Sequence, residues 1–240
     1  MSKKDDLKNI RDSIDSIDNQ ILSLISERAK LAIQAGQVKK DSSKYKPARE
    51  SSILNRLSEL NEGPLEKNQI RNIFNEIISS CRSRETTFTI SYLGPEGTFS
   101  ESALEGQFGK SVEKSPQDTI RSIFESVEDE SSDYGIVPIE NSTEGSVNNT
   151  LDCLSEFNLK ICGEIEMEIH HNLLGHNKPL PKEGFEIHAH EQTLGQCKQW
   201  LESYCPNVRL VSVSSNAQAA SNVKEDNSII AIAGELAATK

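Results

Sequence analysis

The chain has 240 residues, 35% of them hydrophobic, and a net charge of −11. This length allows one or two domains with hydrophobic cores. No apolar run approaches the roughly 20 residues that span a bilayer, and the charged first residues differ from a secretory signal. The five cysteines form no Cys-x-x-Cys pair and are typical of reduced thiols. We therefore expect a cytoplasmic protein rather than a membrane, secreted or disulfide-rich one.

The charge is unevenly distributed along the chain. Residues 1–85 include 16 basic and 13 acidic side chains, whereas residues 86–240 include 10 basic and 24 acidic ones. The second part, with a net charge of −14, repels phosphate backbones, so we expect no binding to nucleic acid. The change in composition predicts a boundary at 84–88, between one domain of residues 1–85 and another of residues 86–240.

The first domain has the pattern of a helical bundle. Pro47 and the Gly63-Pro64 pair separate three predicted helices. These helices cover 5–40, 48–61 and 65–85. In the first, aliphatic residues recur in alternating steps of four and three, which is a heptad pattern. The pattern comprises Ile10, Ile14, Ile17, Ile21, Leu24, Leu31, Ala35 and Val38. Such a helix is roughly 50 Å long, so we expect it to pack against a second chain in an intertwined dimer.

Charged residues interrupt this apolar pattern. Arg28 occupies a heptad position, and Lys39 points within about 20° of it three turns later. Burying either cation without an anion costs several kcal/mol, so an anionic ligand is expected. Glu85 extends the apolar stripe of the third helix. Arg11 points about 100° away from Arg28 and could reach the same ligand only from a partner chain. The alternatives are a register device or internal ion pair for Arg28 and a solvated position for Glu85.

Residues 5–85 resemble the all-helical chorismate mutase family. The resemblance rests on Ile10-Arg11-Asp12, Ile17-Asp18, Ile25-Ser26-Glu27-Arg28, Lys39, Pro47-Ala48-Arg49-Glu50 and the helix over 73–85. It implies an intertwined homodimer of three-helix chains that rearranges chorismate to prephenate. Chorismate binding is assigned by this resemblance to Arg28, Arg49, Glu50 and, from the partner chain, Arg11.

The same resemblance implies catalytic roles for Lys39 and Glu85, both facing the ether oxygen of chorismate. Glu50 would hold the substrate hydroxyl, and Arg49 would support the site. A glutamate can donate a proton only when it is protonated. We therefore expect mutase activity to fall as the pH rises through the pKa of Glu85, and Glu85→Gln to flatten this profile.

After residue 86, short β-rich runs alternate with helical patterns, which predicts an α/β domain with a largely parallel sheet. The predicted strands cover 88–93, 134–139, 161–169, 185–189, 208–213 and 228–233. The predicted helices cover 100–108, 117–128, 146–157, 191–203 and 215–224.

Three polar turns follow predicted strands and open helices, at Gly94–Ser100, Val137–Val147 and Ser214–Gln218. Each presents free backbone N–H groups that can bind a carboxylate or phosphate. Alone, each is a capped helix; together they favour a shared cleft for a small anion. His188 and His190 share a strand face, but two ligands are too few for zinc. We expect no metal or other cofactor.

The second domain resembles prephenate dehydratases. The resemblance rests on Tyr92–Ser100, Val137–Val147, His171–Leu174, His190-Glu191-Gln192, Gln196-Cys197, Ser214–Ala220 and Ile230–Ala238. It implies two α/β lobes, like those of a periplasmic binding protein, with prephenate between them. Prephenate binding is assigned by this resemblance to Thr98, Ser100, Asn141, Thr143, Ser146, Gln192, Gln196 and Ser215. The order of the two domains is that of the bifunctional P-protein family of phenylalanine biosynthesis.

One departure from that family affects the second activity. Its members continue into a Thr-Arg-Phe motif and then an ACT domain that binds phenylalanine, and neither is found in these 240 residues. The resemblance thus implies a chain truncated before both, with an incomplete second lobe and weak or absent dehydratase activity. The alternatives are a mutase joined to an α/β module that only binds a carboxylate, and a helical region that serves only as a dimerisation coil.

Overall fold

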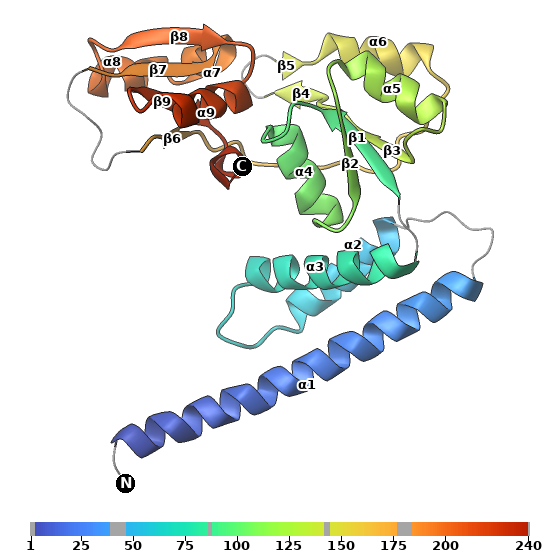
Figure 1. Ribbon diagram of the computed structural model, residues 1–240. Coiled ribbons are helices and arrows are strands. Elements are labelled where there is room, and N and C mark those ends of the chain that lie inside the picture. Colours follow the sequence, from blue (N-terminus) through green and yellow to red (C-terminus); the bar gives the residue numbers. More distant parts are fainter. Residues whose placement is uncertain (1–2, 39–46, 86–87, 142–144, 177–183, 240) are drawn as a thin grey trace. The chain divides into compact units, whose positions relative to one another are not determined.

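The computed structural model describes residues 3–38, 47–85, 88–141, 145–176 and 184–239 (Figure 1). The chain divides into two compact units. The helical unit consists of residues 1–88 and 108–112, and the α/β unit consists of residues 89–107 and 113–240. The short 108–112 segment therefore belongs to the helical unit, although it lies between a helix and a strand of the α/β unit in the sequence.

The helical unit contains α1 (Lys3–Val38), α2 (Pro47–Glu59) and α3 (Lys67–Glu85). Proline suits the first position of α2, because that N–H has no partner within the helix. α3 packs against both α1 and α2, and Leu54, Ile78 and Cys81 are buried between helices. The three helices predicted from the sequence are confirmed within the described residues.

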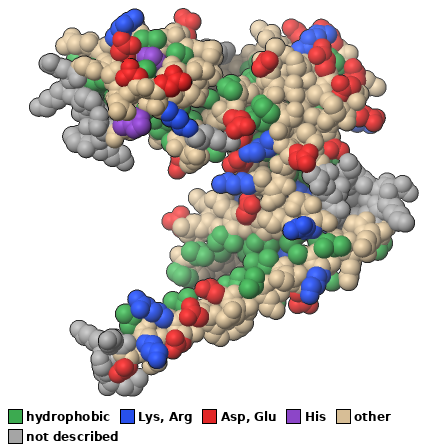
Figure 2. All heavy atoms as spheres, viewed as in Figure 1, with side chains coloured by type: hydrophobic (Ala, Val, Ile, Leu, Met, Phe, Trp, Pro, Cys, Tyr) green, Lys and Arg blue, Asp and Glu red, His purple; other side chains and the backbone are tan. Residues whose placement is uncertain are grey.

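α1 leaves much of its heptad pattern uncovered. Six aliphatic residues of the heptad pattern are between 47% and 65% exposed, namely Ile10, Ile14, Ile17, Ile21, Leu24 and Leu31. Figure 2 shows hydrophobic side chains gathered along α1 on the side towards α3. A continuous exposed aliphatic face of this kind marks an interaction surface rather than a solvated helix.

The α/β unit begins with a three-stranded parallel sheet in the order β2-β1-β3. Its strands are β1 (Thr89–Leu93), β2 (Glu113–Gln117) and β3 (Tyr134–Ile136), accompanied by α4 (Phe99–Phe108), α5 (Ile120–Glu128) and α6 (Asn148–Glu156). Ile90 and Tyr92 on the central strand are fully buried, as is Leu104 of α4. A two-stranded antiparallel pair, β4 (Glu140–Asn141) and β5 (Gly145–Ser146), precedes α6.

A second sheet of four strands has the order β6-β9-β7-β8, with only β6 antiparallel to its neighbour. The strands are β6 (Asn172–Leu174), β7 (Glu186–His190), β8 (Arg209–Val213) and β9 (Ile229–Ala233), and the helices are α7 (Glu191–Gln196), α8 (Lys198–Tyr204), α9 (Asn216–Glu225) and α10 (Glu235–Thr239). Ile187, Leu201 and Ile230 form its hydrophobic core. The expected fold class, helical and then largely parallel α/β, is confirmed.

Several predicted elements were wrong. The apolar-acidic alternation at 161–169 predicted a strand, but this segment pairs with no strand among the described residues, and Ile161 is 75% exposed. β2 was not predicted, because its residues are polar and include Pro116; its place at a sheet edge tolerates a proline. The helix predicted at 146–157 begins only at Asn148, because Gly145 and Ser146 pair with β4. The helix predicted at 191–203 is divided at Cys197 into α7 and α8.

Among the described helices, none combines the length and apolar character needed to cross a membrane.

Candidate functional sites

The cations predicted to bind chorismate lie on two helices of the helical unit. Arg28 is half-buried on α1, whereas Arg11 on the same helix is exposed. Seventeen residues along a straight helix separate them by about 26 Å, so one chain cannot bring both to one small ligand. Arg49 is exposed in the first turn of α2. Lys39 and the side chain of Glu85 lie outside the described residues.

Glu50, expected to hold the substrate hydroxyl, is bound by an arginine that sequence analysis missed. Nη1 of Arg82 donates to both carboxylate oxygens of Glu50, at 2.5 Å. Arg82 is 5% exposed, and its Nη2 donates to the carbonyl oxygen of Phe108 at 2.6 Å. Glu50 lies 32 positions before Arg82, so no local pattern indicated this pairing.

In the α/β unit, a buried carboxylate accepts a hydrogen bond from the turn before α4. The N–H of Gly97, whose φ is +84°, donates to Oε2 of Glu101 at 2.6 Å, and Glu101 has no exposed surface. The hydroxyl of Thr98 donates to the carbonyl oxygen of Leu93 at 3.0 Å and accepts from the Glu101 N–H at 3.5 Å. These bonds fix the turn that carries Thr98, and Ser100 follows it in the first turn of α4, half-buried.

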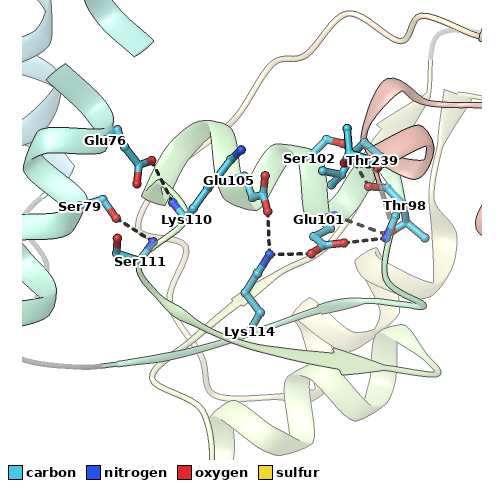
Figure 3. Close-up of polar contacts among 12 residues, drawn as sticks. Glu76, Ser79, Thr98, Glu101, Ser102, Glu105, Lys110, Ser111, Lys114 and Thr239 are labelled. Atoms are coloured by element: carbon cyan, nitrogen blue, oxygen red, sulfur yellow. Dashed lines mark hydrogen bonds and ion pairs between the residues drawn. The ribbon is translucent and has the colours of Figure 1, made fainter. Parts of the chain in front are cut away.

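Lys114 of β2 neutralises this carboxylate. Its Nζ donates to Oε1 of Glu101 at 2.6 Å and to Oε1 of Glu105 at 2.7 Å (Figure 3). Burial lowers the pKa of Lys114, but its hydrogen bonds to the two glutamates raise it more, so the pKa lies above its ordinary value. Neither Glu101 nor Lys114 was predicted from the sequence; a glutamate four residues after a turn glycine was the only local sign.

The start of α9 is fixed by side-chain hydrogen bonds. Ser215 caps the helix by accepting from the Gln218 N–H at 3.0 Å, which is the capped-helix alternative for this turn. Asn216 accepts from the His190 N–H at 2.9 Å and donates to the Thr193 hydroxyl at 2.8 Å. The beginnings of α7 and α9 are therefore tied together, and Gln192 lies in the first turn of α7, half-buried.

The starts of α4 and α9 meet within the α/β unit. A Cβ placed on Gly97 would lie 3.3 Å from the Cα of Ala237 and 3.6 Å from the Cβ of Ala217. Phe99 packs edge-on against the ring of His171, with centroids 5.6 Å apart, and Nε2 of His171 is 2.8 Å from Oε1 of Gln196. Thr98, Gln196 and Ser215, predicted from separate motifs, are therefore carried by segments that lie next to one another.

The predicted turn at Val137–Val147 has a different structure from the one expected. Asn141, half-buried, and Ser146, exposed, lie on the β4–β5 pair. α6 begins after Val147 without a side-chain cap, so Ser146 does not cap it. Thr143 lies outside the described residues. Among the described residues, no group of three or more His, Cys, Asp or Glu could hold a metal ion.

The fold and these turns define a class: a helical domain with cations on a long helix, followed by an α/β domain whose helix starts meet at the ends of parallel strands. Helix N-termini in that position bind small anions. Comparison with known families agrees with this class. The chorismate mutase type II model matches residues 10–86, and the prephenate dehydratase model matches residues 90–240.

Individual relatives point to the same family. The bifunctional chorismate mutase/prephenate dehydratase of Stutzerimonas stutzeri is 44% identical over 99% of this chain and 67% of its own length. The enzyme of the same name from Pseudomonas aeruginosa is 42% identical over the whole chain and 67% of its own length. This chain belongs to the family of bifunctional chorismate mutase/prephenate dehydratases, and it spans about two thirds of the length of these relatives.

A solved structure resembles part of the chain. The prephenate dehydratase of Staphylococcus aureus superposes with a TM-score of 0.52 and 27% identity, over 61% of this chain and 54% of that one. The chain thus spans about half of the solved relative.

Proposed function

We propose that the helical unit rearranges chorismate to prephenate and that the α/β unit dehydrates and decarboxylates prephenate to phenylpyruvate. The observation that carries the first activity is the half-buried Arg28 on an α1 whose aliphatic face is exposed. A second chain packed on that face would bury the aliphatic residues and bring its Arg11 towards Arg28. The proposed assembly is therefore a homodimer with shared mutase sites.

The rearrangement is unimolecular, so the protein must supply shape and charge rather than a nucleophile. Arg28 and the partner's Arg11 would bind the two carboxylates and hold the substrate in its compact conformation. Lys39 and Glu85 would stabilise negative charge that develops on the ether oxygen. Glu50 would accept a hydrogen bond from the substrate hydroxyl, and Arg49 would support the site.

Dehydration of prephenate requires carboxylate binding and a proton for the departing hydroxyl. The adjoining starts of α4 and α9 supply N–H groups for a carboxylate, with Thr98, Gln196 and Ser215 beside them. Ser100, Asn141, Thr143, Ser146 and Gln192 are the other proposed contacts. Both reactions proceed without a cofactor in this proposal, and we place the enzyme in the cytoplasm.

Turnover of chorismate by the purified chain tests the first activity. We expect Arg28→Ala to lower kcat/KM by at least about a hundredfold, because a charge-assisted contact to a carboxylate is lost. Lys30→Ala, an exposed cation of the same helix, is the matched control and should retain activity. Unchanged turnover in Arg28→Ala would support the dimerisation coil instead.

Conversion of prephenate to phenylpyruvate tests the second activity. Product formation by the purified chain supports the dehydratase, whereas tight binding of prephenate without product would favour a binding module. Prephenate is also the product of the proposed mutase site and could bind there. Calorimetric titration of the Arg28→Ala variant with prephenate therefore measures binding to the α/β unit alone.

A further inference from the structure

The 108–112 segment packs closely against α3, and two backbone hydrogen bonds and a glycine fix its position. The Lys110 N–H donates to the Glu76 carboxylate at 3.3 Å, and the Ser111 N–H donates to the Ser79 hydroxyl at 3.4 Å (Figure 3). Gly109 has a φ of +73°, and a Cβ there would lie 2.4 Å from the Cβ of Ser79. Ser79 is 1% exposed, so a larger residue at position 109 would have to displace either α3 or the segment. Only glycine allows the segment to approach α3 this closely.

This segment also determines where Arg82 lies. The carbonyl oxygen of Phe108 accepts from Nη2 of Arg82 at 2.6 Å. The guanidinium carbon lies 5.2 Å from the ring centroid of Phe88 and 5.9 Å from that of Phe108, and these two rings pack edge to face. A buried arginine enclosed by two aromatic rings and a carbonyl oxygen has little rotational freedom.

Arg82 in turn restrains Glu50. Its Nη1 reaches both carboxylate oxygens, and the Glu50 side chain is 16% exposed. An ionised carboxylate has about four acceptor positions, so Glu50 can bind Arg82 and still accept a further hydrogen bond. Without Arg82, a partly buried carboxylate would lose both its counter-charge and its orientation.

We propose that the 108–112 segment and Arg82 position Glu50 for substrate, so that chorismate binding depends on residues from within the dehydratase match. The match to the prephenate dehydratase family covers residues 90–240, and therefore includes this segment. Arg82 is a positioning residue, since it acts through Glu50. The inference rests on the proposed mutase function and on the hydroxyl-binding role of Glu50.

The test compares two glycine variants in the full chain. Gly109→Ala places a Cβ against Ser79 and displaces the Phe108 carbonyl oxygen from Arg82. We expect the KM for chorismate to rise at least about threefold with kcat nearly unchanged, because a contact made equally in ground and transition states is weakened. Gly106→Ala is the matched control: it lies on α4, and a Cβ there meets no described atom within 4 Å. Its KM should equal that of the unmodified chain.

Arg82→Lys provides a second variant that keeps the charge. A single ammonium cannot serve Glu50 and the Phe108 carbonyl oxygen as the planar guanidinium does, so the KM should again rise. In the Glu50→Gln background, Arg82→Lys should add no further increase, because its effect passes through Glu50.

Two results would overturn the inference while leaving the proposed function intact. One is an active enzyme whose KM is unchanged in both Gly109→Ala and Arg82→Lys. The other is a double variant in which the Arg82 and Glu50 effects multiply, which would make Arg82 a purely structural residue. An unmodified chain that never consumes chorismate would instead refute the proposed function.

Discussion

Glu101 combines complete burial with a negative charge, and its partners are a backbone N–H on one side and an ammonium group on the other. A buried carboxylate costs several kcal/mol unless it is paired and hydrogen-bonded. A charged residue at this buried position is explained if the Gly97–Thr98 turn must keep one conformation. Because this turn lies at the start of α4, its conformation bears on the proposed binding of prephenate.

Glu101→Gln should weaken prephenate binding about three- to tenfold, because the amide loses the charge that holds Lys114 and the Gly97 N–H. The measurement is calorimetric titration of prephenate in the Arg28→Ala background. Glu105→Gln is the matched control: Glu105 also binds Lys114 but, among the described residues, forms no hydrogen bond with the Gly97–Thr98 turn. Equal weakening by both substitutions would contradict a specific role for Glu101.

The stability of the α/β unit should depend on pH through Lys114. Because folding raises the pKa of Lys114 above its ordinary value of 10.5, the folded state binds this proton more tightly. The stabilisation is therefore present below pH 10.5 and declines as the pH rises through the folded pKa. Melting temperatures from about pH 8 to about pH 11.5 should fall less steeply in Glu101→Gln, where the ion pair is already weakened. Parallel curves would show that the Lys114–Glu101 ion pair does not contribute to the pH dependence of stability.

At the scale of elements, α1 is so long and so rich in aliphatic residues that α2 and α3 cannot cover its apolar face. The exposed face that includes Ile10, Ile17 and Leu24 runs over several turns. Burial of apolar surface stabilises by about 25 cal/mol per Å², so pairing two such faces gives a strong driving force for association.

Ile17→Lys should therefore convert the proposed dimer into monomers, because a buried unpaired ammonium is costly at an apolar interface. Sedimentation equilibrium measures the mass, and the same samples should lose chorismate turnover, since Arg11 of the partner is removed from the site. Asn19→Lys, an exposed position about 200° around the helix, should leave both unchanged. A monomeric unmodified chain would contradict the shared site.

At the scale of the whole molecule, the two units have separate cores, Leu54, Ile78 and Cys81 in one and Ile187, Leu201 and Ile230 among others in the second. Trp200, the single tryptophan, lies on α8 in the α/β unit. Its fluorescence therefore reports the unfolding of that unit, whereas far-ultraviolet circular dichroism reports both.

Ile78→Ala should destabilise the helical unit by about 2–5 kcal/mol and shift the circular dichroism transition in urea, but leave the Trp200 transition in place. Ile187→Ala should do the reverse, shifting the Trp200 transition to lower urea. A single transition that moves with either substitution would show that the two units unfold cooperatively.

Local patterns in the sequence were enough for much of the fold. The heptad repeat of α1, the proline that begins α2 and the Ser215 cap of α9 each depend on residues a few positions apart, so they can be recognised without a structure. The motifs that match the family are also contiguous. They identified the segments that carry Thr98, Gln196 and Ser215, which the structure brings together.

The pairings that only the tertiary structure decided are long-range and polar. Arg82 binds Glu50 from 32 positions away, and Lys114 reaches Glu101 from a strand that no periodicity predicted. The strand expected at 161–169 had the right alternation but found no partner strand among the described residues. Alternation and heptads report which face of an element is apolar, because the residues of one face recur at a fixed spacing along the chain. Which charged side chains form pairs depends instead on how distant segments pack. The sequence of one segment does not indicate which other segment it will contact.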